Sequence, residues 1–314
     1  MAGKVIAVTV NPSIDKTIAI KELEPYGLNR VVESRQDPGG KGINVARVLH
    51  SFDTDVTVTG FVAGNSGRQL VDFLKDAQLP ADFVEIEGET RTNLKVFDQK
   101  AGKTTEINES GAAVSPENLE KFKEKFRNLC KNSEVAVLSG SLPPGVPKNF
   151  YAQCIDMAKT EHVKTILDAD GEALAEGLKS IPYAVKPNIH ELEALLGRIL
   201  KTPKDVLAAA RELIAAGISI VIVSMGPDGA VVADAHEAFK VDSWDIPVKS
   251  ATGAGDSMVG SLAYSIVRGD SLYDIAKITT AAGTITASKP GTQICTRPEV
   301  LDSLHFVTVT KIED

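Results

Sequence analysis

Short apolar runs alternate with longer amphipathic segments from one end of the chain to the other. Six runs have the length and composition of buried strands: residues 5–10, 56–61, 135–138, 165–168, 184–186 and 219–223. Eight segments are compatible with helices: residues 43–52, 67–77, 116–129, 149–159, 189–196, 203–216, 256–268 and 272–288. Apolar strands that alternate with helices predict an α/β fold with a doubly wound, mostly parallel sheet flanked by helices. Ligands of such sheets bind at the carboxyl ends of the strands.

Two inserted segments do not follow this alternation of strands and helices. They alternate polar and apolar side chains on either side of short turns: residues 17–20 with 30–36, and residues 93–98 with 104–108. Antiparallel ribbons of this kind predict a small β-sheet lid, formed by segments of about 13–37 and 88–110, which would cover a site, pair subunits, or do both. Because the chain has no long linker or internal repeat, we expect one domain spanning residues 1–314.

The composition limits the classes of partner. The formal net charge is −8 and no run of Lys and Arg exceeds two residues, so nucleic acid is not an expected partner. The apolar run near the N-terminus is too short for a signal sequence, and no later segment approaches a membrane span. Three cysteines and five histidines show no metal-ligand spacing or triad pattern. We therefore expect a cytoplasmic protein with reduced thiols.

A glycine-rich turn near the C-terminus carries the strongest chemical signal. Gly253, Ala254 and Gly255 expose successive backbone N–H groups before an apolar helix, which suits an anion. Asp256 places a carboxylate in the first turn of that helix, where it could accept a proton from an attacking hydroxyl. The structural alternative is that Asp256 only complements the helix dipole.

A second glycine turn precedes the helix at 43–52. Gly39 and Gly40 allow a ligand to approach the backbone, Lys41 supplies a charge for phosphate, and Asn44 can bind sugar hydroxyls. The spacing differs from a Walker A loop, because glycine follows Lys41.

Polar residues in the N-terminal half suit a sugar phosphate. Asp15 follows the first strand and can hold two hydroxyls, although an ordinary Asx turn is an equal alternative. Arg91, Asn93 and Lys95 share one face of a strand by its period of two. That face suits a phosphorylated substrate, or it is the solvated face of an edge strand.

Three further loops follow predicted strands. Ser139 opens a small-residue loop that is either a binding-site floor or a plain turn. Asn188 and Glu191 have capping-box spacing, and the alternative is that they orient water on Mg²⁺ beside Lys186. Residues 224–229 are either a hairpin turn or a loop at the edge of a nucleotide.

Five motifs in this order resemble the ribokinase-like sugar kinases of the PfkB family: residues 11–15, 39–44, 139–145, 186–191 and 253–256. The resemblance covers essentially the whole chain. Within the family, the chain looks most like the phosphosugar branch, and residues 105–111 are most similar to 1-phosphofructokinase, with tagatose-6-phosphate kinase close.

The resemblance implies a role for each motif. Asp256 would be the catalytic base, and the amides of Gly253, Ala254 and Gly255 the anion hole. ATP would contact Lys186, Asn188, Ser224, Gly226, Gly229, Thr252, Gly253 and Gly255. The sugar phosphate would contact Asp15, Gly39, Gly40, Lys41, Asn44, Arg91, Asn93, Lys95 and Ser139. Glu191 and Asn188 would organise Mg²⁺ through water.

We therefore expect ATP-dependent phosphorylation of a ketose phosphate by a homodimer that pairs through the lid. Fructose 1-phosphate is the expected acceptor, giving fructose 1,6-bisphosphate, with tagatose 6-phosphate and fructose 6-phosphate as alternatives. A non-catalytic sugar-phosphate sensor would predict a lost base or a broken anion loop, and both are intact. A dinucleotide oxidoreductase is disfavoured because no G-x-G-x-x-G follows the first strand.

Overall fold

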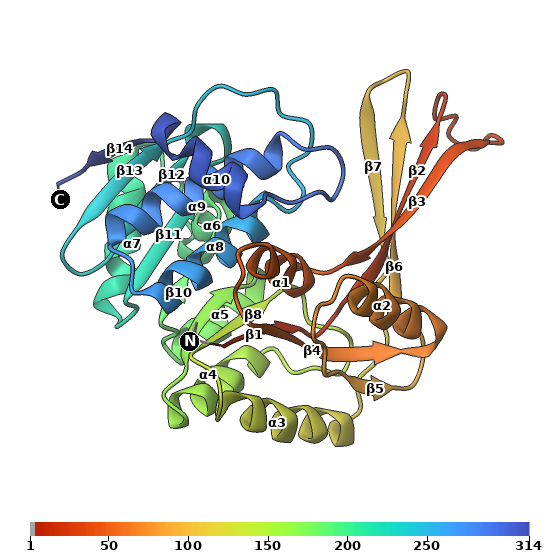
Figure 1. The fold of residues 1–314 in the computed structure, drawn as a ribbon, viewed down its shortest axis with the longest axis horizontal. Coiled ribbons are helices and arrows are strands. Elements are labelled where there is room, and N and C mark those ends of the chain that lie inside the picture. The colour runs from red at the N-terminus through yellow and green to blue at the C-terminus, as the bar shows by residue number, and fades with distance from the viewer. Residues whose placement is uncertain (1–3, 314) are drawn as a thin grey trace.

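The computed structural model describes residues 4–313. The main sheet contains ten strands, in the order β14 (Thr308–Lys311), β13 (Ala238–Asp242), β12 (Ala230–Ala233), β11 (Ile220–Ser224), β10 (Ala184–Val185), β9 (Lys164–Asp168), β8 (Val135–Ser139), β1 (Val5–Thr9), β4 (Val56–Ala63) and β5 (Val84–Ile86) (Figure 1). Neighbours from β11 to β5 pair in parallel, and β12, β13 and β14 add an antiparallel edge.

Helices cover both faces of this sheet. One face packs against α1 (Lys41–Ser51), α2 (Gly64–Asp76), α8 (Ala254–Arg268), α9 (Leu272–Ala287) and α10 (Arg297–Ser303). The other packs against α3 (Pro116–Cys130), α4 (Phe150–Thr160), α5 (Gly171–Lys179), α6 (Ile189–Leu196) and α7 (Pro203–Ala215). Alternation along β1 explains the two cores, because Val5 and Ala7 face one helix layer while Ile6 and Val8 face the other. The predicted doubly wound α/β architecture is confirmed.

A separate four-stranded sheet forms the lid. Its order is β3 (Val31–Gly39), β2 (Ser13–Ile20), β6 (Arg91–Asp98) and β7 (Lys103–Asn108). Each predicted ribbon is antiparallel, and a parallel pairing of β2 with β6 joins the two ribbons. Figure 1 shows this sheet rising from the main body beside α1 and α2.

Several elements differ from the sequence-based expectation. β2 begins at Ser13 rather than at residue 17, whereas β6 begins at Arg91, as the shared strand face of Arg91, Asn93 and Lys95 predicts. No element was predicted for the antiparallel edge strands, for α5 or for α10. The edge strands depend on pairing between distant segments, since β13 pairs with β14 some seventy residues later in the chain. Periodicity within a short window does not contain that information.

Two features of the described residues concern the predictions about membrane spans and cysteine thiols. No helix among residues 4–313 is long and apolar enough to cross a membrane. Cys130, Cys154 and Cys295 are all buried free thiols, and burial raises the pKa of Cys130 to about 12.

Candidate active site

A cleft of 220 Å³ lies between the lid and the carboxyl ends of the central strands. Thr9 and Ser139 line it from the ends of β1 and β8, and Lys41 from the start of α1. The lid contributes Arg91, Asn93 and Asn108. Four of the predicted sugar-site residues therefore face the same cavity: Lys41, Arg91, Asn93 and Ser139. The other five predicted residues are not part of its lining: Asp15, Gly39, Gly40, Asn44 and Lys95.

Asp256 occupies the first turn of α8 behind Lys41 and is only 7% exposed. Its Oδ2 accepts a hydrogen bond of 2.8 Å from Nδ2 of Asn44 on α1. Burial raises the pKa of Asp256 to about 6, and the nearby Asp168 carboxylate contributes to this shift. Its place in the first turn also lets the carboxylate complement the dipole of α8.

Asp168 is a central residue that the sequence analysis missed. It ends β9, is 2% exposed, and lies between two lysines from separate motifs. Lys41 Nζ is 3.5 Å from its Oδ2, and Lys186 Nζ is 3.4 Å from its Oδ1. Burial opposes the charge on Asp168, but the two ammonium groups outweigh it and keep the pKa of Asp168 below its ordinary value. Its place at the carboxyl end of a predicted strand was the available signal.

The glycine turn at residues 253–255, here called the anion turn, lies next to this charged cluster. Gly253 adopts a left-handed conformation with φ of 82° and caps the start of α8. A Cβ placed on Gly255 would lie 3.4 Å from Lys186 Nζ, so the ammonium group sits directly against the turn. The backbone N–H groups at the start of α8 and a lysine thus converge beside Asp256, which is a favourable arrangement for a phosphoryl group.

Asp15 is held by the lid rather than in a turn. Its Oδ2 is 3.0 Å from Lys95 Nζ, and its Oδ1 accepts hydrogen bonds from Ser13 Oγ at 2.8 Å and Asn93 Nδ2 at 3.2 Å. The Asx-turn alternative is wrong, because Asp15 lies within β2. A Cβ placed on Gly39 would lie 2.3 Å from Oδ1 of Asp15, so the glycine permits this close approach.

Arg91 lies on an internal strand. β6 is flanked by β2 and β7, so the edge-strand alternative is also wrong. The guanidinium group donates to the backbone oxygens of Asn11, at 2.9 and 3.2 Å, and of Glu109, at 3.2 Å. These acceptors are neutral and leave its charge available to an anion in the cleft.

The loop after β10 has the predicted helix-capping structure. Asn188 Oδ1 accepts from the Glu191 backbone N–H, and Glu191 Oε2 accepts from that of Asn188, each at 2.9 Å. This confirms the capping box. Only Oε2 of Glu191 takes part in the box, which leaves the other carboxylate oxygen for a ligand or water.

The expected nucleotide loop is a hairpin turn between β11 and β12. Ser224 pairs with Asn188 in an isolated bridge, which joins this loop to the capping box. Gly226 and Gly229 both have positive φ, and a Cβ on Gly229 would lie 1.9 Å from the Val241 backbone oxygen. Thr252 precedes the anion turn, with its N–H donating to Ser250 Oγ at 3.2 Å. The positive φ explains both glycines, and close packing against Val241 is a second reason at Gly229 only.

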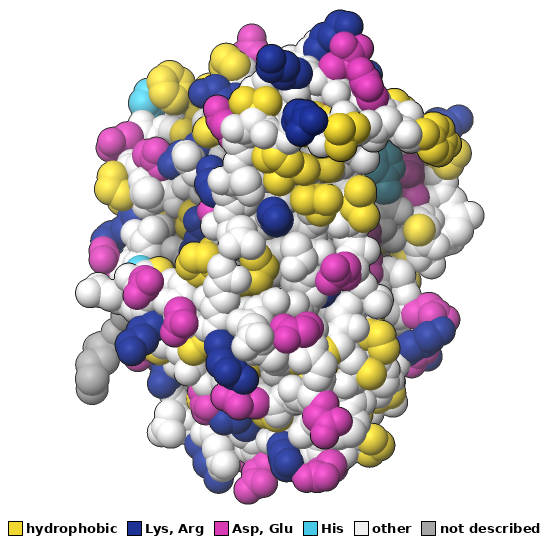
Figure 2. All heavy atoms as spheres, turned by 90° about the vertical axis from the view of Figure 1, so that its right-hand side faces the viewer, with side chains coloured by type: hydrophobic (Ala, Val, Ile, Leu, Met, Phe, Trp, Pro, Cys, Tyr) yellow, Lys and Arg dark blue, Asp and Glu magenta, His cyan; other side chains and the backbone are white. Residues whose placement is uncertain are grey.

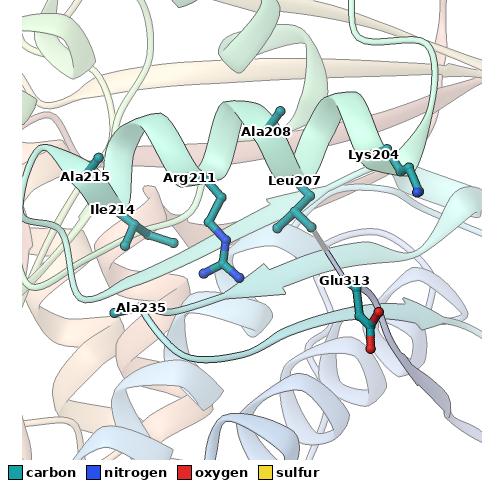
Figure 3. Close-up of a pocket in the computed structure, with 8 residues that line it drawn as sticks. All are labelled: Lys204, Leu207, Ala208, Arg211, Ile214, Ala215, Ala235 and Glu313. Carbon is teal, nitrogen blue, oxygen red and sulfur yellow. The ribbon is translucent and has the colours of Figure 1, made fainter.

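A larger, open groove of 720 Å³ runs along α7, away from these residues (Figure 3). Leu207, Arg211 and Ile214 line it from the helix, and Glu313 from the end of the chain. It contains none of the residues of the cleft between lid and sheet.

Comparison with known proteins matches this architecture to one family. The pfkB family carbohydrate kinase model matches residues 8–299. Phosphofructokinase-2 from Escherichia coli in complex with potassium is 32% identical, with 98% of this chain and 99% of that chain covered and a TM-score of 0.92. The same enzyme in complex with fructose-6-phosphate is 32% identical over 98% and 99% of the two chains, with a TM-score of 0.90. A "possible 1-phosphofructokinase" from Thermotoga maritima is 27% identical over 99% and 100%, with a TM-score of 0.89. The chain therefore belongs to the pfkB family of carbohydrate kinases, phosphotransferases that act on a hydroxyl acceptor.

Proposed function

We propose that this kinase transfers the γ-phosphoryl group of ATP to a primary hydroxyl of a ketose phosphate, and that fructose 1-phosphate is converted to fructose 1,6-bisphosphate. The observation that carries the proposal is the buried Asp256 carboxylate, which has a pKa raised to about 6 and lies next to an anion-binding turn. A base with that pKa is ionised at neutral pH and still accepts a proton readily.

The transfer requires one proton and one phosphoryl group to move. The substrate hydroxyl loses its proton to the Asp256 carboxylate as its oxygen bonds to the γ-phosphorus, and the bond to the bridging β–γ oxygen breaks, releasing ADP. The amides of residues 253–255 and the Lys186 ammonium stabilise the charge on the moving group. Lys41 neutralises charge on the sugar side.

The sugar phosphate is assigned to the cleft between lid and sheet. Asp15 holds sugar hydroxyls together with Asn44, Asn93 and the backbone of Gly39 and Gly40. Arg91 is the proposed partner of the phosphate that the substrate already carries, because its guanidinium lines the cleft and its hydrogen bonds go to neutral backbone oxygens. Lys95 is already paired with Asp15 and supports that carboxylate.

ATP is assigned to the C-terminal half, along Lys186, Asn188, the 224–229 hairpin and Thr252. Kinases of this kind use a divalent metal, and Mg²⁺ prefers oxygen ligands and retains several waters. In residues 4–313 no group of three His, Cys, Asp or Glu side chains is arranged to hold a metal. The free oxygen of Glu191 fits an ion held mainly by phosphate oxygens and water. When bound, Mg²⁺ would neutralise charge on the ATP phosphates.

The acceptor is tested by comparing kcat/KM for fructose 1-phosphate, fructose 6-phosphate and tagatose 6-phosphate with the purified protein. We expect fructose 1-phosphate to give the highest value. A higher value for either 6-phosphate would reassign the substrate within the same reaction. ATP turnover with none of the three would contradict a phosphoketose acceptor.

We further propose that the lid pairs two subunits. Large exposed hydrophobic side chains cluster on it: Tyr26, Leu28, Val31, Val32, Phe97 and Ile107. Figure 2 shows apolar side chains gathered on the upper part of this face, where the lid lies. Such patches mark contact surfaces. A neighbour, phosphofructokinase-2 from Escherichia coli, is described in a tetrameric inhibited form.

The double variant Val32→Glu/Ile107→Glu is expected to convert a dimer into a monomer. Charges placed on both outer strands of the lid would have to be buried in the interface. Light scattering coupled to size exclusion measures the mass against the 33.4 kDa of one chain. Ile199→Glu, at an exposed site outside the lid, is the matched control and should remain dimeric. A monomeric wild-type protein would refute the proposal.

A further inference from the structure

Arg47 is a partly buried cation next to the candidate active site that none of the assigned roles uses. It lies one helical turn after Asn44 on α1, so the two side chains are neighbours. Its Nη1 donates to Asn44 Oδ1 at 3.3 Å and to the Thr292 backbone oxygen at 3.2 Å. Burial lowers the pKa of Arg47, but the group remains a cation at any working pH.

The Asn44 amide lies between two groups of opposite hydrogen-bonding character. A guanidinium group only donates, and an ionised carboxylate only accepts. The amide therefore has one orientation that satisfies both neighbours, with its oxygen toward Arg47 and its NH₂ toward Asp256. Without Arg47, the amide could also turn its oxygen toward Asp256 and accept a hydrogen bond from the protonated carboxyl, which would favour the acid form.

We propose that Arg47 is a positioning residue for the base: it fixes the Asn44 amide so that its NH₂ always faces Asp256. The inference rests on the proposed function of Asp256. A hydrogen bond donated to the ionised carboxylate favours that form over the protonated one. It also holds the carboxylate in one rotamer, facing the site of transfer.

The segment after α9 holds Arg47 in place. Thr292 is 5% exposed, and its hydroxyl accepts a hydrogen bond of 3.4 Å from Arg35 on lid strand β3. Figure 1 shows this loop, in blue between α9 and α10, reaching toward the base of the lid. A Cβ on Gly291 would lie 2.6 Å from Arg35 Nη2, so the contact is close. Arg47 therefore has a fixed anchor on its far side.

The charged groups around the base come from several elements. Those that shift the pKa of Asp256 are Asp168 of β9, Lys41 of α1 and Lys186 after β10. Those that shift the pKa of Arg47 are Asp37 and Arg35 of β3 and Asp15 of β2. Because Arg47 donates to Asn44, and Asn44 in turn donates to Asp256, we expect its influence to pass through the amide.

The test is a double-mutant cycle of Arg47→Met with Asn44→Ala. We expect Arg47→Met alone to lower kcat about 10-fold, the scale of one hydrogen bond to a charged group. The carboxyl pKa of Asp256, followed by ¹³C NMR in the substrate-free protein and assigned by its loss in Asp256→Asn, should rise by roughly half a unit or more. In the Asn44→Ala background, Arg47→Met should change neither quantity further. Arg47→Lys, which retains a charge and a donor, should restore part of both.

Other outcomes of this double-mutant cycle would contradict the proposed role of Arg47. If Arg47→Met has the same effect with and without Asn44, the residue acts through the Thr292 loop or by charge alone, and the proposal fails. Arg35→Met, which loosens the same loop without touching Asn44, is the matched control and should leave the pKa of Asp256 unchanged. Because the NMR titration needs no turnover, its outcome does not depend on whether Asp256 is the base. Should Arg47→Met not fold, the same cycle with Arg47→Lys gives the coupling.

Discussion

Asp256→Asn is expected to lower kcat by on the order of 10²-fold or more, the scale of losing a general base, while raising the stability of the substrate-free protein. The amide cannot accept the proton of the attacking hydroxyl. The stability gain follows from the raised pKa. An acid whose pKa is about 6 in the folded state and 3.8 in the unfolded state disfavours folding once it is ionised. Its replacement should therefore stabilise the protein above pH 6, by at most about 3 kcal/mol for a shift of about two units.

The measurement is kcat at saturating substrates together with the free energy of unfolding at pH 5 and pH 8. Asp274→Asn is a matched control, because Asp274 occupies the equivalent position in the first turn of α9 but is exposed. There, loss of the charge should destabilise the helix by roughly 0.3–1 kcal/mol and leave kcat unchanged. Full activity of Asp256→Asn would remove this residue from the chemistry. A loss of stability would show that its ionised form is well accommodated.

Asp168→Asn is expected to reduce kcat/KM on the order of 10²-fold, because the buried Lys186 and the partly exposed Lys41 lose their shared counter-ion. Lys41 and Lys186 belong to different halves of the site, and displacement of a positioning group by about 1 Å can cost that much. Removing one partner of a buried charge cluster also destabilises the fold by about 3–5 kcal/mol.

The pH profile separates this role from simple misfolding. Since Asp168 raises the pKa of Asp256, the acid limb of kcat/KM, expected near pH 6 in the wild type, should move to lower pH in Asp168→Asn. Activity would then begin to fall at a lower pH than in the wild type, with the same steepness. Asp156→Asn removes the same charge from an exposed position on α4 and should leave the limb in place. An unmoved limb in Asp168→Asn would mean that the two carboxylates are electrostatically independent.

Much of the fold was accessible from local patterns. Apolar runs identified the parallel strands except the short β5, and the polar-apolar alternation of the inserted segments identified both lid ribbons. The capping-box spacing of Asn188 and Glu191 predicted the start of α6. The antiparallel edge was not accessible, because a strand such as β14 is short, largely exposed and defined by pairing with distant β13.

Some residues of the candidate site were likewise predicted from local patterns, and others were not. Glycine turns carry a local signal, so Gly39 and Gly253 pointed directly to the two turns at which we propose that phosphate groups bind. Asp168 carries no motif, and its role appears only when Lys41 and Lys186 meet on it in space. Arg47 likewise reads as an ordinary helix cation until the Asn44 amide is seen between it and Asp256.

The parallel pairing of β2 with β6 has a consequence for when catalysis is possible. Asp15, Asn93 and Lys95 are joined across that pairing, so a swing of the lid would carry all three together. Asp256, Lys186 and the anion turn belong to the main body and would stay behind. With the lid raised, the proposed nucleotide site would thus remain complete, but the pocket for the sugar acceptor would be absent. Binding of the sugar would assemble that pocket, so ATP would be protected from hydrolysis until the acceptor is in place.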